Sequence, residues 1–532
     1  MIRNPILPGF NPDPSICRVG DEYFIATSTF EWYPGVQIHR STDLVNWDLV
    51  ARPLNRASQL DMRGNPDSCG IWAPCLSHDG EKFWLVYTDV KRNEGNFKDA
   101  HNYIVTCDTI DGDWSDPTFV SSHGFDPSLF HDDNGRKYWL VLRWNHISNS
   151  VGGNPKHRAF DGILCQEWSE RDGLIGPIKV ISHGSKLGLT EGPHLSKRDG
   201  WYYLTVAEGG TGYDHAVTMA RSRDIWGPYA LHPDTHLITA KDAPDAPLQR
   251  AGHGQIVETP DGRTYHTHLC SRPLPGLEKR FSPLGRETAI QECEWRDDGW
   301  LYAKHGPVPQ VEVPGLTDAQ PRPTRPVCRT FNTRTLPPEF QWLRTPQPER
   351  LFTLTGKALR LTGRESVGSW FEQSLVARRQ EHLSYRAETV VDFRPQSYQQ
   401  MAGLTTYYNR HKFHFAGVTK HPEAGLSLFI LSCPGMWPDG QMSYPMQPRP
   451  INEGPVDLAV IVTGATQQFW WRQGQDWNPL GPELDAAVIS DEGGRGEHGS
   501  FTGAFVGMLC FDTTGLGRTA DFARFDYHPV GA

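Results

Sequence analysis

A polar turn followed by an aromatic or apolar strand recurs along roughly the first 300 residues of the chain. Each copy has a glycine, up to two polar residues and then a run of aromatic and aliphatic side chains, as in Gly80-Glu-Lys-Phe-Trp-Leu-Val-Tyr. The five glycines, spaced 55 to 65 residues apart, are Gly20, Gly80, Gly135, Gly200 and Gly262. A near-constant period of this length indicates repeated supersecondary units.

Each unit carries a second marker seven to nine residues before its glycine. The five markers are Asp13-Pro-Ser-Ile, Ala73-Pro-Cys-Leu, Asp126-Pro-Ser-Leu, Gly192-Pro-His-Leu and His253-Gly-Gln-Ile. Each unit therefore begins with a short strand that forms a hairpin with the next one. Several short strands per unit are typical of a four-stranded β-propeller blade. The alternative, ordinary hairpins of a β-sandwich, rarely keeps a fixed period over five units.

The repeat pattern fades after Trp300 into a proline-rich segment, which is typical of a linker. Farther on, alternating runs such as 385–393 predict strands with one face toward a core, and about 200 residues of such strands indicate a β-sandwich. We predict an all-β chain with a five-bladed β-propeller over 1–306, a linker over 307–326 and a β-sandwich over 327–532. The 52 glycines, 42 prolines and 18 tryptophans agree with many turns and pleated surfaces.

Charge and hydropathy exclude several classes of partner. The chain has 52 Lys and Arg against 62 Asp and Glu, a formal charge of −10, so nucleic acid is not expected as a partner. Prolines interrupt the start before any apolar stretch reaches signal-peptide length, and no run approaches about 18 apolar residues. We therefore expect a cytoplasmic protein without a membrane segment. The 10 cysteines form no C-x-x-C pair, which argues against a zinc site and a dense disulfide framework.

The repeat phase places chemically active side chains together. The innermost strand of a propeller blade starts near the central axis, so residues at one phase gather in a ring. The ring positions are Asp13, Ala73, Asp126, Gly192 and His253, with Trp72 and Glu191 one position earlier. Three carboxylates, a histidine and a tryptophan are thus predicted to converge on one funnel.

Crowded carboxylates raise one another's proton affinity, so at least one of them would stay protonated near neutral pH. Glycoside hydrolysis needs such an acid for the leaving oxygen and a second carboxylate to activate water or attack the sugar. The flat faces of Phe30 and Trp72 would suit a pyranose ring. Structural roles stand beside this interpretation: Asp before Pro commonly initiates turns, and His253 is as well suited to packing or hydrogen bonding.

The motifs NPDPSI, GIWAP, FDPSLF, TEGPHL and SPLGRETAIQ resemble, in this order, glycoside hydrolase family 43, and the opening resembles its β-xylosidase branch. The resemblance extends along nearly the whole chain and includes FTGAFVGM in the second domain. It implies that Asp13 is the general base, Glu191 the general acid and Asp126 the residue that orients the acid and tunes its pKa. It also implies that Arg286 binds sugar hydroxyls near the acid.

Further site residues follow from the same resemblance. Phe30, Trp72, Trp144 and Thr211 match positions that wall the subsites, and Phe501 matches an aromatic side chain of the second domain that closes the funnel. Phe505 is the competing choice for that last position. No cofactor is required by the resemblance. Some members hold a calcium ion on the propeller axis near a histidine, and His253 is the matching candidate, although calcium prefers oxygen ligands.

The implied activity is removal of single xylose units from the non-reducing ends of β-1,4-xylo-oligosaccharides with inversion, along with a side activity on α-L-arabinofuranosides. Inversion requires the two carboxyl groups to lie about 6.5 to 9.5 Å apart. Related enzymes form dimers or tetramers, so a homo-oligomer is expected.

Four alternatives stay open at this point. The chain could act mainly as an α-L-arabinofuranosidase, as a non-catalytic sugar-binding propeller or as a protein-interaction propeller. The sandwich could also be a carbohydrate-binding module that uses Trp437, Trp470 and Trp471, whereas the resemblance favours a domain that closes the active site.

Overall fold

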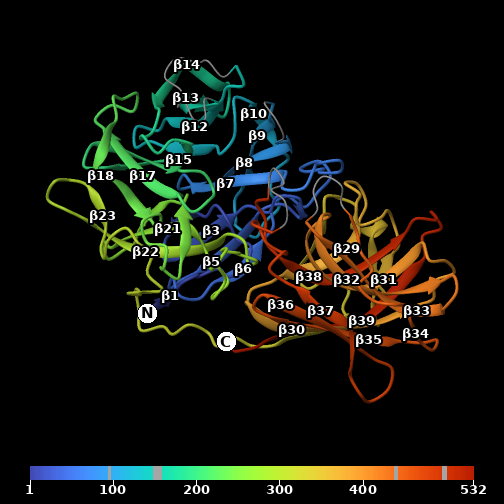
Figure 1. Ribbon diagram of the computed structural model, residues 1–532. Helices are drawn as coiled ribbons and strands as arrows, with labels where there is room; N and C mark the ends of the chain where they lie inside the picture. Colours follow the sequence, from blue (N-terminus) through green and yellow to red (C-terminus); the bar gives the residue numbers. More distant parts are fainter. Residues whose placement is uncertain (94–96, 148–158, 436–440, 494–499, 532) are drawn as a thin grey trace.

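The structure is a computed structural model that describes residues 1–93, 97–147, 159–435, 441–493 and 500–531. In this part of the chain it is built from β-strands, and the only helix is a 3₁₀ turn at Pro348–Arg350. Figure 1 shows a ring of small sheets, coloured blue to yellow-green, beside a two-layered β-domain, coloured orange to red. The predicted fold class, a five-bladed propeller followed by a β-sandwich, is confirmed.

The propeller has five antiparallel sheets, here called blades I to V in chain order. Blade I comprises β2 (Ser15–Val19), β3 (Glu22–Thr27), β5 (Gln37–Ser41) and β6 (Asp48–Ala51). Blade II comprises β7 (Gly70–His78), β8 (Phe83–Arg92), β9 (Asp99–Cys107) and β10 (Thr118–Ser121). Blade III comprises β11 (Ser128–His131), β12 (Lys137–Trp144), β13 (Phe160–Ser169) and β14 (Gly173–Ser182).

Blade IV comprises β15 (Glu191–Arg198), β16 (Trp201–Glu208), β17 (Ala216–Ser222) and β18 (Ala230–Thr239). Blade V comprises β19 (Gln249–Gly252), β20 (Ile256–Glu258), β21 (Thr264–Ser271), β22 (Glu287–Trp295) and β23 (Leu301–Ala303). Its innermost strand is divided, because β19 and β20 both pair with β21 and His253 lies between them. The repeat glycines of all five units lie in the turns between the first strands of the blades and have positive φ.

The ring closes between the chain start and blade V. The Asn4 side chain donates to the Ile290 carbonyl at 2.7 Å and accepts from the Ile290 amide at 2.9 Å, and Leu7 pairs with Thr288. In addition β1 (Ile2–Arg3) pairs with β24 (Glu312–Val313), so the segment predicted as a linker includes a strand that packs on the propeller. The circle is thus held by paired backbone rather than by side-chain packing alone.

All five ring positions share one backbone conformation. Asp13, Ala73, Asp126, Gly192 and His253 have φ of 57°, 36°, 59°, 57° and 38°. This left-handed region costs a residue with a Cβ atom roughly 1 to 2 kcal/mol, and four of the five also precede proline, which is itself restrictive. The same strained turn therefore recurs at the start of every innermost strand, which the sequence repeat reflects.

The second domain is a sandwich of two antiparallel sheets. One contains β25 (Val327–Thr330), β27 (Phe352–Leu354), β28 (Leu359–Thr362), β30 (Ser384–Phe393), β35 (Val456–Thr463), β36 (Thr466–Arg472), β37 (Asn478–Asp485) and β39 (Thr519–Pro529). The other contains β26 (Phe340–Leu343), β29 (Ser374–Arg379), β31 (Gln400–Asn409), β32 (Lys412–His421), β33 (Gly425–Pro434), β34 (Arg449–Pro450) and β38 (Phe505–Asp512). Burial alternates along β30 as its sequence predicts, so one face of this strand fills the core.

A short strand of the propeller completes the second sheet of the sandwich. Between β3 and β5 of blade I, the chain forms β4 (Trp32–Tyr33), which pairs with β26, with Trp32 opposite Leu343 and Tyr33 opposite Trp342. The Trp32 ring is fully buried and stacks on Phe505 with the ring centroids 3.6 Å apart. The two domains therefore share both a β-sheet and an aromatic core.

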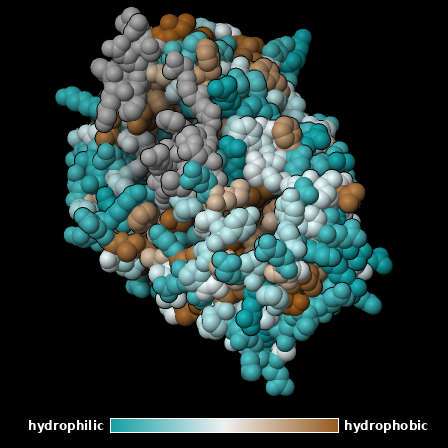
Figure 2. Space-filling view, turned by 45° about the vertical axis from the view of Figure 1, so that its right-hand side comes forward, coloured by the Kyte–Doolittle hydropathy of each residue, from teal (hydrophilic) through white to brown (hydrophobic). Residues whose placement is uncertain are grey.

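Other sequence expectations can be compared with the described residues. All 10 cysteines are free thiols and eight of them are buried. Trp471 is half-buried under the Arg449 guanidinium, whereas Trp437 lies outside the described residues. No helix in the described ranges is long and apolar enough to cross a membrane. On the face seen in Figure 2, hydrophobic residues lie scattered among hydrophilic ones.

Candidate active site

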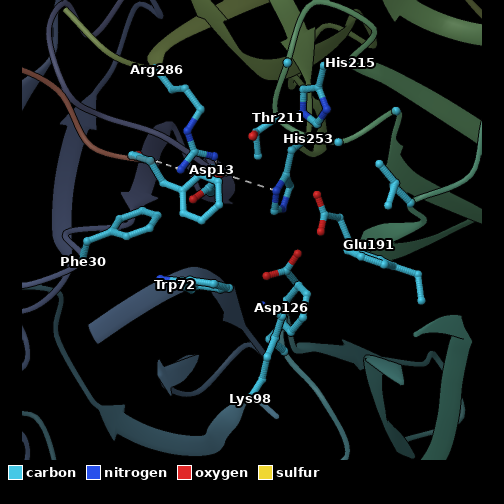
Figure 3. Close-up of a pocket in the computed structure, with 17 residues that line it drawn as sticks. Asp13, Phe30, Trp72, Lys98, Asp126, Glu191, Thr211, His215, His253 and Arg286 are labelled. Carbon is cyan, nitrogen blue, oxygen red and sulfur yellow. Dashed lines mark hydrogen bonds and ion pairs between the residues drawn. The ribbon is translucent and has the colours of Figure 1, made fainter. Parts of the chain in front are cut away.

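A cavity of about 400 Å³ opens on the propeller axis and is covered on one side by the sandwich. Its lining includes the charged and polar side chains of Asp13, Lys98, Asp126, Glu191, Thr211, His215, His253 and Arg286. Figure 3 shows that these side chains come from different blades and point toward one centre. Concave sites of this size with a few convergent polar groups are typical of small-molecule binding.

Asp13 is an ionised carboxylate at the base of this cavity. Its Oδ1 lies 2.8 Å from Arg286 Nη1 and 3.6 Å from His253 Nδ1, and its Oδ2 accepts a hydrogen bond from the Ser28 hydroxyl at 2.7 Å. Burial raises the pKa of Asp13, but Arg286, His253 and Ser28 together outweigh it and hold the pKa below its ordinary value. Asp13 can therefore accept a proton only transiently at neutral pH.

Glu191 and Asp126 are a pair of carboxyl groups that face each other in Figure 3. Their pKa values are raised, whereas that of Asp13 is lowered. Burial and the nearby charge of Asp13 raise the pKa of Glu191 to about 8. Burial and the charges of Glu191 and Asp13 also raise the pKa of Asp126, although its Oδ2 accepts the Gly192 amide at 3.1 Å. The two carboxyls titrate as a coupled pair, so one of them holds a proton at neutral pH.

His253 and Arg286 both lie against Asp13. Burial lowers the pKa of His253, so its imidazole is neutral beside Asp13. Arg286 is only 3 % exposed; its Nη2 donates to the Phe501 carbonyl at 3.1 Å, and its Nε has no hydrogen-bond partner among the described residues. A β-carbon on Gly192 would lie 2.7 Å from His253 Nε2, so this position needs glycine as long as the imidazole keeps its place.

Aromatic rings form the side walls. The ring centroids of Phe30, Trp72 and Phe501 lie 5.8 to 6.4 Å from one another. Ser68 connects two of the three, because its carbonyl accepts the Trp72 indole N–H at 2.9 Å and its hydroxyl accepts the Phe501 amide at 3.2 Å. Phe505 is instead buried against Trp32, so the structure places Phe501 rather than Phe505 at the cavity.

Nine of the ten predicted site residues line the cavity, and Trp144 is the exception. A register shift at the end of β12 places Trp144 opposite Phe160 in β13, and its ring packs behind Phe125 and Phe160. These two phenylalanines form the wall in its place. The structure therefore places Trp144 in contact with two residues of the wall, and its predicted role at a subsite stays a prediction.

Sequence reasoning also missed several lining residues. Phe125 immediately precedes ring residue Asp126, as Trp72 and Glu191 precede theirs, so the repeat phase could have identified it. Lys98 lies over the Trp144 ring, with its Nζ 4.6 Å from the centroid, and burial lowers its pKa. Neither Lys98 nor His215 stands at a repeat position, so no signal in the sequence marked them.

The residues around His253 do not form an evident calcium cage. In the ranges that the structure describes, no group of three or more His, Cys, Asp or Glu side chains is arranged to hold a metal ion. Calcium takes six to eight oxygen ligands, and a neutral imidazole beside one carboxylate supplies few of them.

Comparisons with known proteins cover both domains of the chain. The family model described as "Glycosyl hydrolases family 43" matches residues 2–301, and that described as "Beta xylosidase C-terminal Concanavalin A-like domain" matches residues 328–528. The chain is 57% identical to a xylosidase/arabinosidase of Humicola insolens, covering 99% of this chain and 98% of that protein. It is 46% identical to a β-xylosidase of Bacillus subtilis, covering 99% of each chain. A crystal structure of a xylan β-1,4-xylosidase from Bacillus halodurans C-125 superposes with a TM-score of 0.94 at 46% identity, covering 99% of this chain and 100% of that one.

Proposed function

The chain belongs to glycosyl hydrolase family 43, and from this premise we propose that it is an inverting exo-β-1,4-xylosidase that releases xylose from the non-reducing ends of xylo-oligosaccharides. The observation that carries the proposal is the pair of opposite proton affinities in one cavity. Asp13 is held ionised, whereas Glu191 is held protonated. These are the two states that a general base and a general acid need before the reaction begins.

In the proposed reaction, Asp13 takes a proton from a water molecule as the water oxygen attacks the anomeric carbon. Glu191 simultaneously gives its proton to the glycosidic oxygen, the carbon–oxygen bond breaks, and the shortened oligosaccharide leaves as an alcohol. The water oxygen becomes the anomeric hydroxyl on the opposite face, so β-linked substrate yields α-xylose. The next turnover begins after Asp13 releases its proton to solvent and Glu191 regains one.

Asp126 and Arg286 support the two reacting groups. The Oδ2 of Asp126 accepts the Gly192 amide, next to Glu191, and we assign Asp126 the role of orienting the acid and tuning its pKa. Arg286 keeps Asp13 ionised at 2.8 Å, and we assign its remaining donor capacity to hydroxyl groups of the terminal sugar.

Closure of the cavity supports exo action. Phe501 from the sandwich meets Phe30 and Trp72 over the carboxylates, which leaves a cup rather than an open groove. A cup that is closed by Phe501 accepts the end of an oligosaccharide. Hydrolysis of α-L-arabinofuranosides is the second candidate activity, favoured by the 57% identity to a protein named xylosidase/arabinosidase.

Proton NMR of the anomeric signals during digestion of xylobiose tests the stereochemistry. We expect α-xylose to appear first and to mutarotate to the β anomer only later, because water enters opposite to the leaving group. An aryl α-L-arabinofuranoside measured in parallel gives the ratio of the two activities. Early β-xylose would indicate a retaining mechanism, in which one carboxylate is the nucleophile, and would refute the roles given to Asp13 and Glu191.

The pH dependence of kcat/KM on xylobiose is expected to show an alkaline limb with an apparent pKa of about 8, because Glu191 must be protonated to act. Changing Asp126→Asn removes one charge of the coupled pair and should move this limb to lower pH. On the acid side, activity should persist at pH values below the ordinary pKa of an aspartate, because the lowered pKa of Asp13 keeps this base ionised there. An alkaline limb that stays unchanged in Asp126→Asn would contradict the coupling of Asp126 with Glu191.

The cytoplasmic location, the dimeric or tetrameric state and a calcium ion near His253 remain predictions from the sequence. None of them is needed for the proposed mechanism.

A further inference from the structure

Arg250 is a buried cation that connects the two domains beside the cavity without lining it. It belongs to β19, three residues before His253, is only 4 % exposed and has a φ of 54°. A left-handed arginine in the interior costs free energy both in its backbone and in desolvation of its charge. Its contacts therefore need to be strong and well placed.

The three arms of the guanidinium reach different segments. Nε donates to the Thr211 carbonyl at 2.8 Å, in the glycine-rich segment 209–212 that lines the cavity. Nη2 lies 2.7 Å from Asp491 Oδ2, and Nη1 lies 3.3 Å from Glu492 Oε1. A planar group with fixed donor directions thus holds one wall of the cavity against a loop of the sandwich.

Asp491 is linked through Tyr408 to the residue that follows Phe501. The Tyr408 hydroxyl donates to Asp491 Oδ1 and accepts the Thr502 amide at 2.9 Å. Thr502 follows Phe501, the residue that closes the cup, and Figure 1 shows this red segment ahead of β38 extending toward the propeller. An unbroken series of polar contacts therefore joins the Thr211 wall to the Phe501 wall through Arg250, Asp491 and Tyr408.

Glu492 anchors the same loop to the propeller a second time. Its Oε1 accepts the Tyr213 hydroxyl at 3.0 Å, its Oε2 accepts the Ser282 amide at 2.9 Å, and its carbonyl accepts Lys279 Nζ at 2.6 Å. Because Glu492 retains these partners, loss of Arg250 would free mainly Thr211 and Asp491. The loop would stay docked while the distance between the two walls of the cup relaxed.

We propose that Arg250 is a positioning residue that sets the width of the cup between Thr211 and Phe501 and thereby selects the terminal sugar. The proposal rests on the proposed function, since it concerns the site that binds the non-reducing xylose unit. A six-membered pyranose and a five-membered furanose differ in the width they need, so a change in this spacing alters the two activities unequally. Small displacements of a binding wall have large effects on rates, up to about a hundredfold for 1 Å.

Two variants test the proposal in the full-length protein. Arg250→Lys keeps the positive charge but cannot serve three acceptors in different directions. Arg250→Met combined with Asp491→Asn removes the cation together with the more deeply buried of its two carboxylates, while Glu492 keeps its hydrogen bonds from Tyr213 and Ser282. The matched control is Arg52→Met, because Arg52 is a half-buried interdomain arginine that donates to the Phe340 carbonyl, yet neither of its contacts lines the cavity.

We expect both Arg250 variants to raise KM for an aryl β-xyloside and the inhibition constant of free xylose roughly tenfold, with a smaller fall in kcat. The ratio of xyloside to arabinofuranoside activity should shift at least about threefold, whereas Arg52→Met should keep the wild-type ratio while lowering Tm. Unchanged KM and an unchanged ratio in the Arg250 variants, with a Tm loss like that of the control, would reduce Arg250 to a structural ion pair and overturn the proposal.

The outcome for Arg250 can be separated from the outcome for the proposed function. Wild-type release of xylose from xylobiose is measured first and tests the function alone. If the wild type released neither sugar, calorimetric binding of xylose would still test Arg250: weaker binding in both variants, with the control unchanged, supports the proposal, and equal binding overturns it. If Arg250→Lys fails to fold, the charge-neutral double variant gives the same comparison.

Discussion

Replacing Glu191 by alanine is expected to lower kcat/KM on xylobiose by roughly a thousandfold or more, within the range that general acid catalysis contributes. An aryl β-xyloside with an activated phenol leaving group should lose far less activity, because its leaving oxygen departs with little protonation. The physical basis is the raised pKa of Glu191, about 8, which keeps the proton available at neutral pH. Steady-state kinetics on the two substrates measure the difference directly.

The control for this variant is Glu292→Gln, which changes a buried carboxylate of blade V that pairs with Lys304 at 2.9 Å and does not line the cavity. It should reduce both activities in equal proportion, if at all. Equal losses on both substrates in Glu191→Ala would assign Glu191 a role in folding or binding instead of acid catalysis.

Glu191→Gln adds a stability readout to the same prediction. The folded pKa of Glu191 is raised above its ordinary value of 4.5, so the folded state holds a proton that the unfolded state releases. Stability from this group is complete below about pH 4.5 and is lost as the pH rises through about 8. The neutral amide escapes this loss, and the variant should therefore melt at a higher temperature than the wild type near pH 8.

Replacing Asp13 by asparagine is expected to abolish hydrolysis of both substrates, with losses of about a thousandfold or more, because water then has no base on its side of the sugar. Removal of the negative charge should also lower the pKa of Glu191, since Asp13 raises that pKa in the wild type. The alkaline limb of any residual activity should move accordingly. Rates for xylobiose and the aryl xyloside, each as a function of pH, measure both effects.

Added azide provides the sharper test of Asp13. The anion needs no base, so it should restore turnover of the aryl xyloside by attacking the anomeric carbon from the side that water uses and forming α-xylosyl azide. Glu191 still supplies the proton where the leaving oxygen needs it. A β-azide product, or rescue of a control such as Asp132→Asn outside the cavity, would be incompatible with Asp13 as the base of an inverting reaction.

The sequence predicted the propeller and the carboxylates for one physical reason. Each blade begins with the same left-handed turn, so the spacing along the chain is enough to align Asp13, Asp126 and His253 with one another. The repeat could also have identified Phe125 as a site residue. It could not predict the packing of Trp144, because a register shift at the end of β12 sets Trp144 opposite Phe160, and such a local irregularity does not recur from blade to blade.

Contacts between the domains were beyond sequence reasoning for a different reason. Arg250 and Asp491 lie far apart along the chain and in separate domains, and neither belongs to a repeat or a motif. Their pairing depends on how the sandwich docks on the propeller. The sheet shared by β4 and β26 depends on docking in the same way, and two residues of strand give no detectable pattern in a sequence.

The shared sheet has a consequence for how the protein is made. Tyr33 is synthesised early, but its partner Trp342 leaves the ribosome about 300 residues later, roughly 15 to 60 s at ordinary rates of translation. During that interval the nascent propeller displays Trp32 and Tyr33 on an unpaired edge, which is the kind of surface that recruits other growing chains. The cup is therefore completed, and the exposed edge is covered, in the same late step, when the last third of the polypeptide folds onto the first third.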